Sequence, residues 1–404
     1  MKIKLPVYLF FCLYFNYSCS EATSNEAKQE SQNKETDTTI NNSKKDSSTV
    51  TFSDCKSDSL DELAYLISCK GYEKSKILTA YFSSNTFKNH EKIVQTKWDS
   101  FQKNRITKLI NFQQNELINE VGKTEILFYP FSGPDILHAQ LFFPDAKQYV
   151  LMGLEPVGSL PVFEHKEDKP DSMSIYYDKI NKSLHAILNY SFFRTISMSN
   201  DLKNQDVDGT LHLLLLFLNR QNNSICSVKP FVLDTSGNVN YLKDFLLLKK
   251  TNSMEKGIEI KFTTVNGEQK QLHYFSIDLS NTAYSKNKSV VNYLNKLNPT
   301  TTYLKGASYL MHNSNFSLIR DYILNTVKQV VQDDSGISFR FFEQSGKWNY
   351  SFYGDYVKPI KLFASRYQKD LDSMYKKQGS KPLGFGLGYN FQDKNSNLMI
   401  AKKK

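Results

Sequence analysis

Two segments of the sequence join apolar residues to a turn that offers a carboxylate. Residues 128–135 (Phe-Tyr-Pro-Phe-Ser-Gly-Pro-Asp) end at Asp135, and residues 154–158 (Leu-Glu-Pro-Val-Gly) contain Glu155. Ligands of open α/β sheets bind just beyond the ends of strands, so both carboxylates are candidate catalytic groups. The alternative is structural, because Gly-Pro-Asp is common in turns, where the aspartate hydrogen-bonds its own backbone.

A second acidic candidate is the pair Asp333-Asp334, which precedes Ser335-Gly336. Adjacent carboxylates suit a hard cation, or one of them acts as a general base if its pKa is raised. Asp, Ser and Gly are also ordinary residues of a turn, and the acidic positions that a calcium-binding loop needs after the glycine are missing. If the protein is an enzyme, we predict one catalytic cleft formed by Asp135, Glu155, Asp333, Asp334 and Arg340.

Other catalytic patterns are weaker. Ser132 and His138 flank Asp135, but the Gly-x-Ser-x-Gly turn of hydrolases is absent, and neighbours along a chain rarely form a triad. The glycines of residues 384–388 have the spacing of a phosphate loop, but no helix is expected after them, so a dinucleotide site is not predicted. No pair among Cys55, Cys69 and Cys226 has metal-ligand spacing. The sequence therefore names no cofactor and leaves metal binding open.

Hydrophobic periodicity and turn residues predict the elements that must position these groups. Ser59 and Glu62 form a capping box at the start of one helix. Asn266-Gly267, between two alternating strands, specifies a tight hairpin. Helices are expected over residues 59–70, 98–119, 171–192, 316–330 and 359–377. Strands are expected over residues 125–129, 149–154, 224–242 (a hairpin), 258–265, 271–279, 339–342, 350–353 and 383–391.

These elements define the predicted fold class. Residues 211–218 are apolar all round, which indicates burial, and the run is too short to span a membrane. Helix and strand signals alternate along the chain without an internal repeat. We predict an α/β or α+β protein in which helices pack on a mixed sheet, and in which one compact body follows a disordered tether.

Residues 1–19 have the form of a secretory signal. Lys2 and Lys4 precede an apolar run over residues 5–15, which is too short to cross a bilayer, and Ser18-Cys19 follows. A cysteine directly after a small residue resembles the lipid-modified residue of bacterial lipoproteins. The resemblance implies a signal peptide over residues 1–18 and an acyl anchor on Cys19. A plain cleaved signal peptide is the alternative.

The polar segment after Cys19 predicts a flexible tether. It contains almost no large apolar side chain, so it cannot bury enough surface to offset the entropy of ordering. We therefore predict a lipidated cysteine and tether over residues 19–50 and a globular domain over residues 51–404. The resemblance to lipoproteins implies an extracytoplasmic protein that is anchored to the bacterial outer membrane through lipid at Cys19.

The net charge and the predicted location together limit the classes of partner that we expect. The net charge of +10 would favour nucleic acid in a cytosolic protein, but the export signal and the lack of a basic recognition motif argue against it. We expect mostly solvated lysines, membrane contact through the anchor, and an envelope protein or a glycan as partner.

Cys55, Cys69 and Cys226 are the cysteines that remain if Cys12 is removed with the signal peptide and Cys19 is acylated. An odd number leaves at least one thiol free. Cys55 and Cys69 are a feasible but stretched pair across one helix. Cys226, inside an apolar run, is expected to be a buried free thiol.

Two classes of function follow. Residues 128–158 and the segment at Asp333-Asp334 resemble segments of uncharacterised secreted bacterial proteins, and this resemblance implies no activity. We favour a lipid-anchored, non-catalytic binding or envelope-associated protein, because no specific catalytic motif is present. The alternative is a carboxylate- or metal-dependent extracytoplasmic hydrolase that uses the five candidate residues above.

Overall fold

A computed structural model describes residues 58–70, 79–161, 170–190, 208–251, 255–391 and 395–404. The chain divides into Met1–Thr51 and Phe52–Lys404, and every described residue belongs to the second unit. The predicted signal, the acyl anchor on Cys19 and the tether lie outside the described residues. None of the described helices combines the length and the apolar character that crossing a membrane requires.

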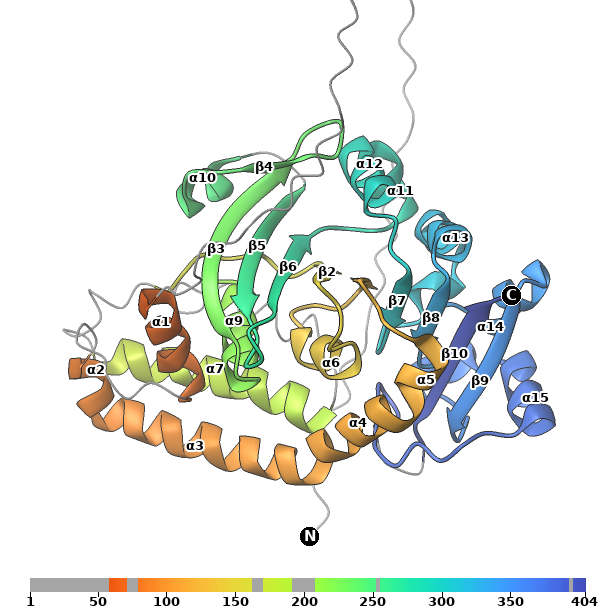
Figure 1. The fold of residues 1–404 in the computed structure, drawn as a ribbon, viewed down its shortest axis with the longest axis horizontal. Helices are drawn as coiled ribbons and strands as arrows, with labels where there is room; N and C mark the ends of the chain where they lie inside the picture. Colours follow the sequence, from red (N-terminus) through yellow and green to blue (C-terminus); the bar gives the residue numbers. More distant parts are fainter. Residues whose placement is uncertain (1–57, 71–78, 162–169, 191–207, 252–254, 392–394) are drawn as a thin grey trace, which may run out of the picture. The chain divides into compact units, whose positions relative to one another are not determined.

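A mixed sheet of ten strands runs through this unit in the order β4-β3-β5-β6-β2-β1-β7-β8-β10-β9 (Figure 1). Its central strands are parallel: β6 (Gln269–Ser276), β2 (Gln148–Gly153), β1 (Ile126–Pro130), β7 (Thr301–Leu304) and β8 (Gln329–Gln332). Antiparallel strands extend both sides: β3 (Ser224–Leu233), β4 (Val239–Tyr241), β5 (Lys256–Thr263), β9 (Trp348–Gly354) and β10 (Asn397–Lys403).

Helices cover both faces of the sheet, because alternate side chains of the central strands enter two separate cores. In β1, Leu127 and Tyr129 join one core and Phe128 joins the other. The first core is covered by α1 (Asp58–Ser68), α2 (Thr79–Ser83), α3 (Asn85–Phe101), α4 (Thr107–Phe112), α5 (Ile118–Val121), α6 (Ile136–Phe142), α7 (Pro170–Tyr190) and α9 (Leu211–Arg220). The second is covered by α11 (Asn281–Lys286), α12 (Lys288–Leu297), α13 (Ser317–Thr326), α14 (Phe339–Ser345) and α15 (Lys369–Gln378).

The predicted fold class is therefore confirmed, and several predicted elements match closely. The helix predicted over residues 59–70 is α1, and the long helical pattern of residues 98–119 lies in α3 to α5, joined by π-helical turns at Gln102–Ile106 and Gln113–Leu117. The hairpin at Asn266-Gly267 joins β5 to β6, with Gly267 at a φ of 82°. A short helix, α10 (Phe245–Lys250), follows β4.

Four predictions in the C-terminal third are wrong. The helix over 316–330 ends at Thr326, because the next residues form β8 between two neighbouring strands. Residues 339–342 lie in α14 rather than in a strand. The helix over 359–377 is broken into a 3-10 segment, Lys361–Arg366, and α15. Residues 383–391 form no strand, because Gly384 and Gly388 adopt left-handed backbone angles.

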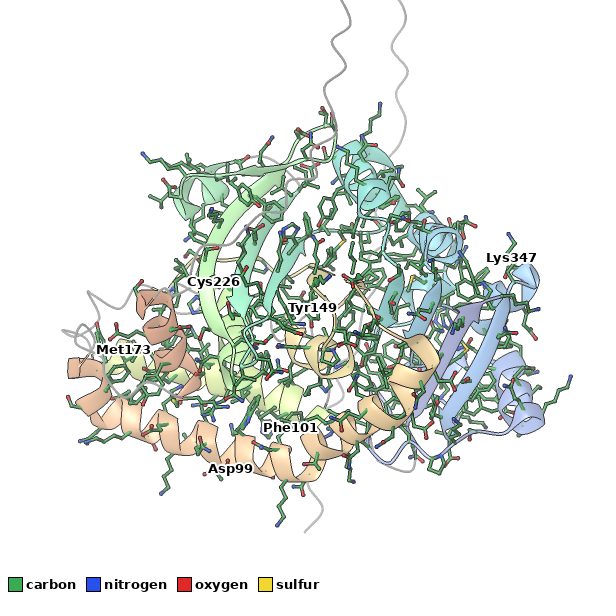
Figure 2. All side chains as sticks on the ribbon, viewed as in Figure 1. Asp99, Phe101, Tyr149, Met173, Cys226 and Lys347 are labelled. Atoms are coloured by element: carbon green, nitrogen blue, oxygen red, sulfur yellow. The ribbon has the colours of Figure 1, made fainter. Side chains whose placement is uncertain are left out.

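One thiol is free, as the odd number of cysteines predicts, but the predictions for individual cysteines are wrong. Cys69 is a free, buried thiol, so it does not pair with Cys55, which lies outside the described residues. Cys226 takes part in a disulfide bond and is not a free thiol. Figure 2 places Cys226 on the antiparallel side of the sheet, in β3.

Candidate functional site

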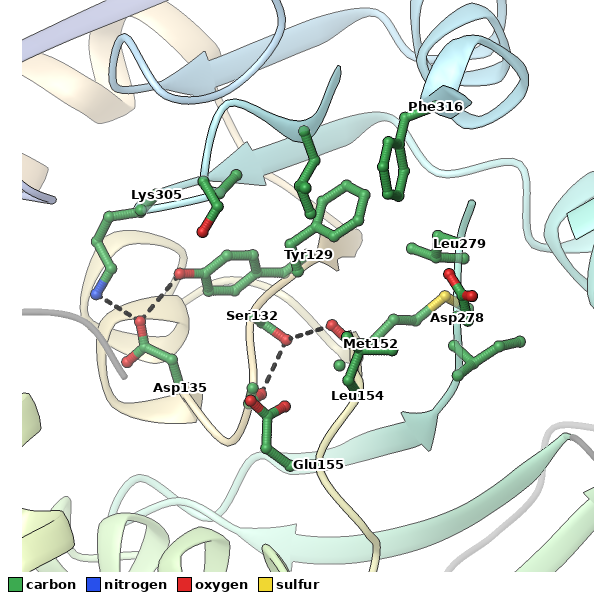
Figure 3. A pocket seen from close by; sticks show the side chains of 18 residues that line it. Tyr129, Ser132, Asp135, Met152, Leu154, Glu155, Asp278, Leu279, Lys305 and Phe316 are labelled. Carbon is green, nitrogen blue, oxygen red and sulfur yellow. Dashed lines mark hydrogen bonds and ion pairs between the residues drawn. The ribbon is translucent and has the colours of Figure 1, made fainter. Parts of the chain in front are cut away.

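A cavity of about 170 Å³ opens at the carboxyl ends of four neighbouring strands, β6, β2, β1 and β7. On one side of β1 lie β2 and then β6, and on its other side lie β7 and then β8. Along the chain, β2 and β6 come first, and β7 and β8 come after them. The strand order therefore reverses between β1 and β7. Open α/β sheets bind ligands at such a point, because the loops on its two sides diverge and leave a crevice. The cavity lies in this crevice (Figure 3).

Asp135 anchors one wall of the cavity as the N-cap of α6, where its carboxylate accepts a hydrogen bond from the His138 backbone N–H. Its Oδ2 lies 2.6 Å from the Lys305 ammonium and 3.0 Å from the Tyr129 hydroxyl. Its Oδ1 lies 2.8 Å from His138 Nδ1. Both oxygens are therefore fully engaged, and the aspartate is held in one orientation.

The charges of this buried cluster balance. Burial alone would raise the pKa of Asp135, but the interactions of its carboxylate with His138 and Lys305, including hydrogen bonds to both, outweigh burial and hold that pKa below its ordinary value. Burial lowers the pKa of His138 to about 4, so the imidazole is neutral at pH 7. Lys305 then supplies the positive charge, even though burial lowers its pKa as well. The result is a fixed ion pair rather than an acid or base ready to exchange a proton.

Glu155 enters the cavity from the loop after β2, and two glycines give it room. A Cβ on Gly153 would lie 2.5 Å from Glu155 Oε2 and 3.1 Å from the Cα of Gly133. The loops after β1 and β2 thus pack backbone to backbone, with the Glu155 carboxylate folded over them. Figure 3 shows this carboxylate near Ser132 and apart from the Lys305–Asp135 pair.

Strained backbone is concentrated around the cavity. Outside glycine, few described residues have a positive φ, and Phe131, Ser308 and Tyr309 are among them, with φ of 59°, 55° and 55°. Phe131 follows β1, and the other two follow β7, so both strained loops flank the point where the strand order reverses. Such conformations cost free energy and cluster at binding and active sites.

Asp333 and Asp334 lie behind the cavity wall rather than in it. Asp333 Oδ2 accepts a hydrogen bond of 2.9 Å from the N–H of Gly306, a residue that lines the cavity. Burial, followed by the charge of Asp334, raises the pKa of Asp333 to about 7. Asp334 accepts from the Tyr309 hydroxyl at 2.7 Å, and burial raises its pKa too.

The structure therefore brings together only part of the predicted cleft. Asp135 and Glu155 share the cavity, and Asp333-Asp334 touch its wall through Gly306 and Tyr309. Arg340 is exposed on α14, where it donates to the His312 carbonyl and covers the Phe341 ring, away from these carboxylates.

Two residues of the site were not predicted from the sequence. Lys305 and Tyr129 complete the Asp135 cluster. Lys305 could have been predicted from the short run Thr-Thr-Tyr-Leu that precedes Lys305-Gly306, because that run forms β7. The glycines of residues 384–388 also have a role that spacing did not suggest: a Cβ on Gly388 would lie 1.9 Å from Asp333 Oδ2.

Nothing in the described part of the chain forms a metal centre, since its His, Cys, Asp and Glu side chains make no group of three suited to an ion. The Ser132 hydroxyl donates to the carbonyls of Gly133 and Met152, so it forms no triad with His138. Comparisons with protein-family models, with curated proteins and with solved structures find no match.

Proposed function

We propose that the cavity binds a nucleoside-like ligand: a flat ring joined to a sugar with neighbouring hydroxyl groups, and without phosphate. The observation that carries this proposal is the place of Glu155. It follows β2, about 20 residues after the glycine turn that follows β1, beside the reversal of the strand order. In doubly wound sheets of this order, an acidic residue there accepts hydrogen bonds from the ribose hydroxyls.

The N-terminus of α6 argues against phosphate. Dinucleotides place their pyrophosphate on the free N–H groups of the helix after β1. Here Asp135 caps those groups and carries a negative charge of its own. Glu155 and Asp278 also line the cavity, and Lys305 is committed to Asp135, so the excess charge is negative and would repel an anion.

An apolar wall supports the flat ring of the ligand. Phe131 and Phe316 form an edge-to-face pair with ring centroids 5.8 Å apart, and Ile277 and Leu279 line the cavity from the loop after β6. Apolar walls with a few placed polar groups are typical of small-molecule sites. These contacts favour binding over carboxylate-driven hydrolysis, because Asp135 is locked in an ion pair and Asp333 does not line the cavity.

Titration calorimetry with adenosine, 2′-deoxyadenosine and AMP tests the ligand class. We expect adenosine to bind, 2′-deoxyadenosine to bind about tenfold more weakly through the loss of one charged hydrogen bond, and AMP not to bind. Glu155→Gln should remove the preference for the ribose. Equal binding of AMP and adenosine, or no binding of any nucleoside, would contradict the proposal.

Methyl transfer from S-adenosylmethionine is a second candidate function, favoured by the order of the last strands of the sheet, β8, β10 and β9. Beyond the five parallel strands, β10 is reversed and lies between β8 and β9. Sheets of S-adenosylmethionine-dependent methyltransferases have this strand order, and the cofactor is a cationic nucleoside without phosphate. The likeness concerns strand order alone, and a fold does not specify an activity.

Our proposal for the location is a lipid anchor at Cys19, supported by the basic residues, short apolar run and small residue that precede it. Lipid-analogue labelling of cells that produce the wild type or Cys19→Ala tests it, and labelling of the wild type alone is expected. The same result separates the two candidate functions, because S-adenosylmethionine is made in the cytoplasm. An anchored protein would use the cavity for nucleosides or glycosides outside the cytoplasm.

A further inference from the structure

We propose that the opposite edge of the sheet carries a surface that binds anionic lipid bilayers. This amino-edge lysine cluster consists of Lys328, Lys347, Lys402, Lys403 and Lys404. It does not depend on the ligand proposed for the cavity.

The sheet itself brings these five lysines together. Lys328 precedes β8 and Lys347 precedes β9. Lys402 and Lys403 end β10, which lies between those two strands, and Lys404 follows it. The backbone N–H of Lys403 donates to the Lys328 carbonyl at 2.8 Å, and that of Lys404 donates to the Lys347 carbonyl at 2.9 Å. Neighbouring strands lie about 4.8 Å apart, so the cluster is compact. Figure 2 labels Lys347 at this end of the sheet.

No carboxylate neutralises the cluster among the described side chains. The ammonium groups of Lys402, Lys403 and Lys404 donate instead to the backbone carbonyls of Glu120, Asn325 and Gly346. The side chain of Glu120 lies 3.8 Å from Lys381, which is outside the cluster. Burial and the neighbouring charge of Lys347 lower the pKa of Lys403, as expected where cations are crowded.

The make-up of the cluster favours lipid headgroups over nucleic acid. Lysines act as point charges, whereas bidentate phosphate recognition uses arginine, which is absent from the cluster. Trp348 is buried under Lys403, 5.3 Å from its ammonium, so it offers no platform on which a base can stack. Clusters of four to eight lysines or arginines beside a membrane-spanning helix or on an amphipathic helix bind anionic lipid, with about 1 kcal/mol from each cation near the surface.

Vesicle co-sedimentation tests the proposal with the full chain carrying Cys19→Ala, so that an acyl group cannot contribute. The probes are vesicles of phosphatidylcholine alone and of phosphatidylcholine mixed with phosphatidylglycerol. We expect binding to the mixed vesicles only, and loss of that binding as salt is added. The triple variant K402Q/K403Q/K404Q should bind about 100-fold more weakly.

The matched control is K88Q/K92Q/K103Q, which removes the same charge from exposed lysines at the first-core helices. It should keep nearly all of the binding. Absence of binding to the mixed vesicles, or equal losses in the two triple variants, would overturn the proposal. Tight binding to heparin without binding to phosphatidylglycerol would also overturn it, in favour of an anionic glycan. None of these outcomes depends on nucleoside binding or on acylation of Cys19.

Discussion

The two edges of the parallel sheet use charge in opposite ways. At the carboxyl edge, several charged groups are buried, as in the Lys305–Asp135 ion pair, whose side chains are 1% and 2% exposed. At the amino edge they are exposed, as in the Lys147–Glu125 pair, whose side chains are 73% and 58% exposed. Buried charges at the carboxyl edge interact strongly, so each must be held in a fixed position beside its partner. At the amino edge, water and salt screen each charge. The first therefore suits a shaped ligand, and the second suits a charged surface.

The largest difference between the edges should appear when one cation is removed from each. Lys305→Met leaves Asp135 buried without its partner and should lower the free energy of unfolding by about 3–5 kcal/mol. Lys147→Met should change it by less than about 1 kcal/mol, because surface pairs contribute little. Urea unfolding monitored by circular dichroism measures both. Similar losses in the two variants would remove the contrast between the edges.

A second test uses pH. The pKa of Asp333 in the folded protein, about 7, lies above its ordinary value of 3.8. The folded state therefore holds the proton more tightly than the unfolded state, and stability falls as pH rises from about 4 to 7. Asp333→Asn should reduce this slope, leaving the part that comes from Asp334, and stabilise the protein at pH 8 by about 2 kcal/mol relative to the wild type. The control is Asp355→Asn, an exposed carboxylate at the same edge, which should leave the slope intact.

A smaller effect is expected from one methyl group in the cavity. Gly153→Ala places a Cβ against Glu155 Oε2 and should displace the carboxylate, lowering the affinity for adenosine about tenfold. Gly379→Ala serves as the control, because its backbone φ of 76° strains an alanine far from the cavity. It should cost stability, about 1 kcal/mol, without changing the affinity. Unchanged affinity in Gly153→Ala would show that Glu155 does not contact the ligand.

The smallest effect on stability should come from the amino-edge lysine cluster. Lys402→Gln removes one exposed charge and should change the free energy of unfolding by no more than about 0.5 kcal/mol. Thermal unfolding at low and high salt measures it, with a slight gain at low salt as repulsion is relieved. A loss above about 1 kcal/mol would mean that the lysine supports the fold rather than a surface.

Local patterns predicted the fold where they agreed with the sheet. The apolar runs of β1 and β2 end at proline and glycine as expected, and Asn266-Gly267 turns the hairpin of β5 and β6. The patterns failed where pairing partners decide the conformation. Val330 keeps helical spacing with α13, yet it lies in β8, because β7 and β10 offer hydrogen bonds on both sides.

The candidate site shows the same limit. Asp135 and Glu155 were predicted as site residues because each follows an apolar run that the sequence shows to be a strand. Lys305 was missed because β7 has only four residues and begins with two threonines. No local pattern reveals that β1 lies between β2 and β7. The convergence of Asp135 with Lys305, and the exclusion of Arg340, are properties of strand order.

The position of β10 also sets the order in which the protein can be completed. β9 pairs with β10 and precedes it in the chain, so β9 has no partner in the sheet until residues 397–403 have been synthesised. Asp334 likewise waits for Asn397, whose side-chain amide donates to it at 3.0 Å. This side of the sheet therefore closes only after residues 397–403 are available.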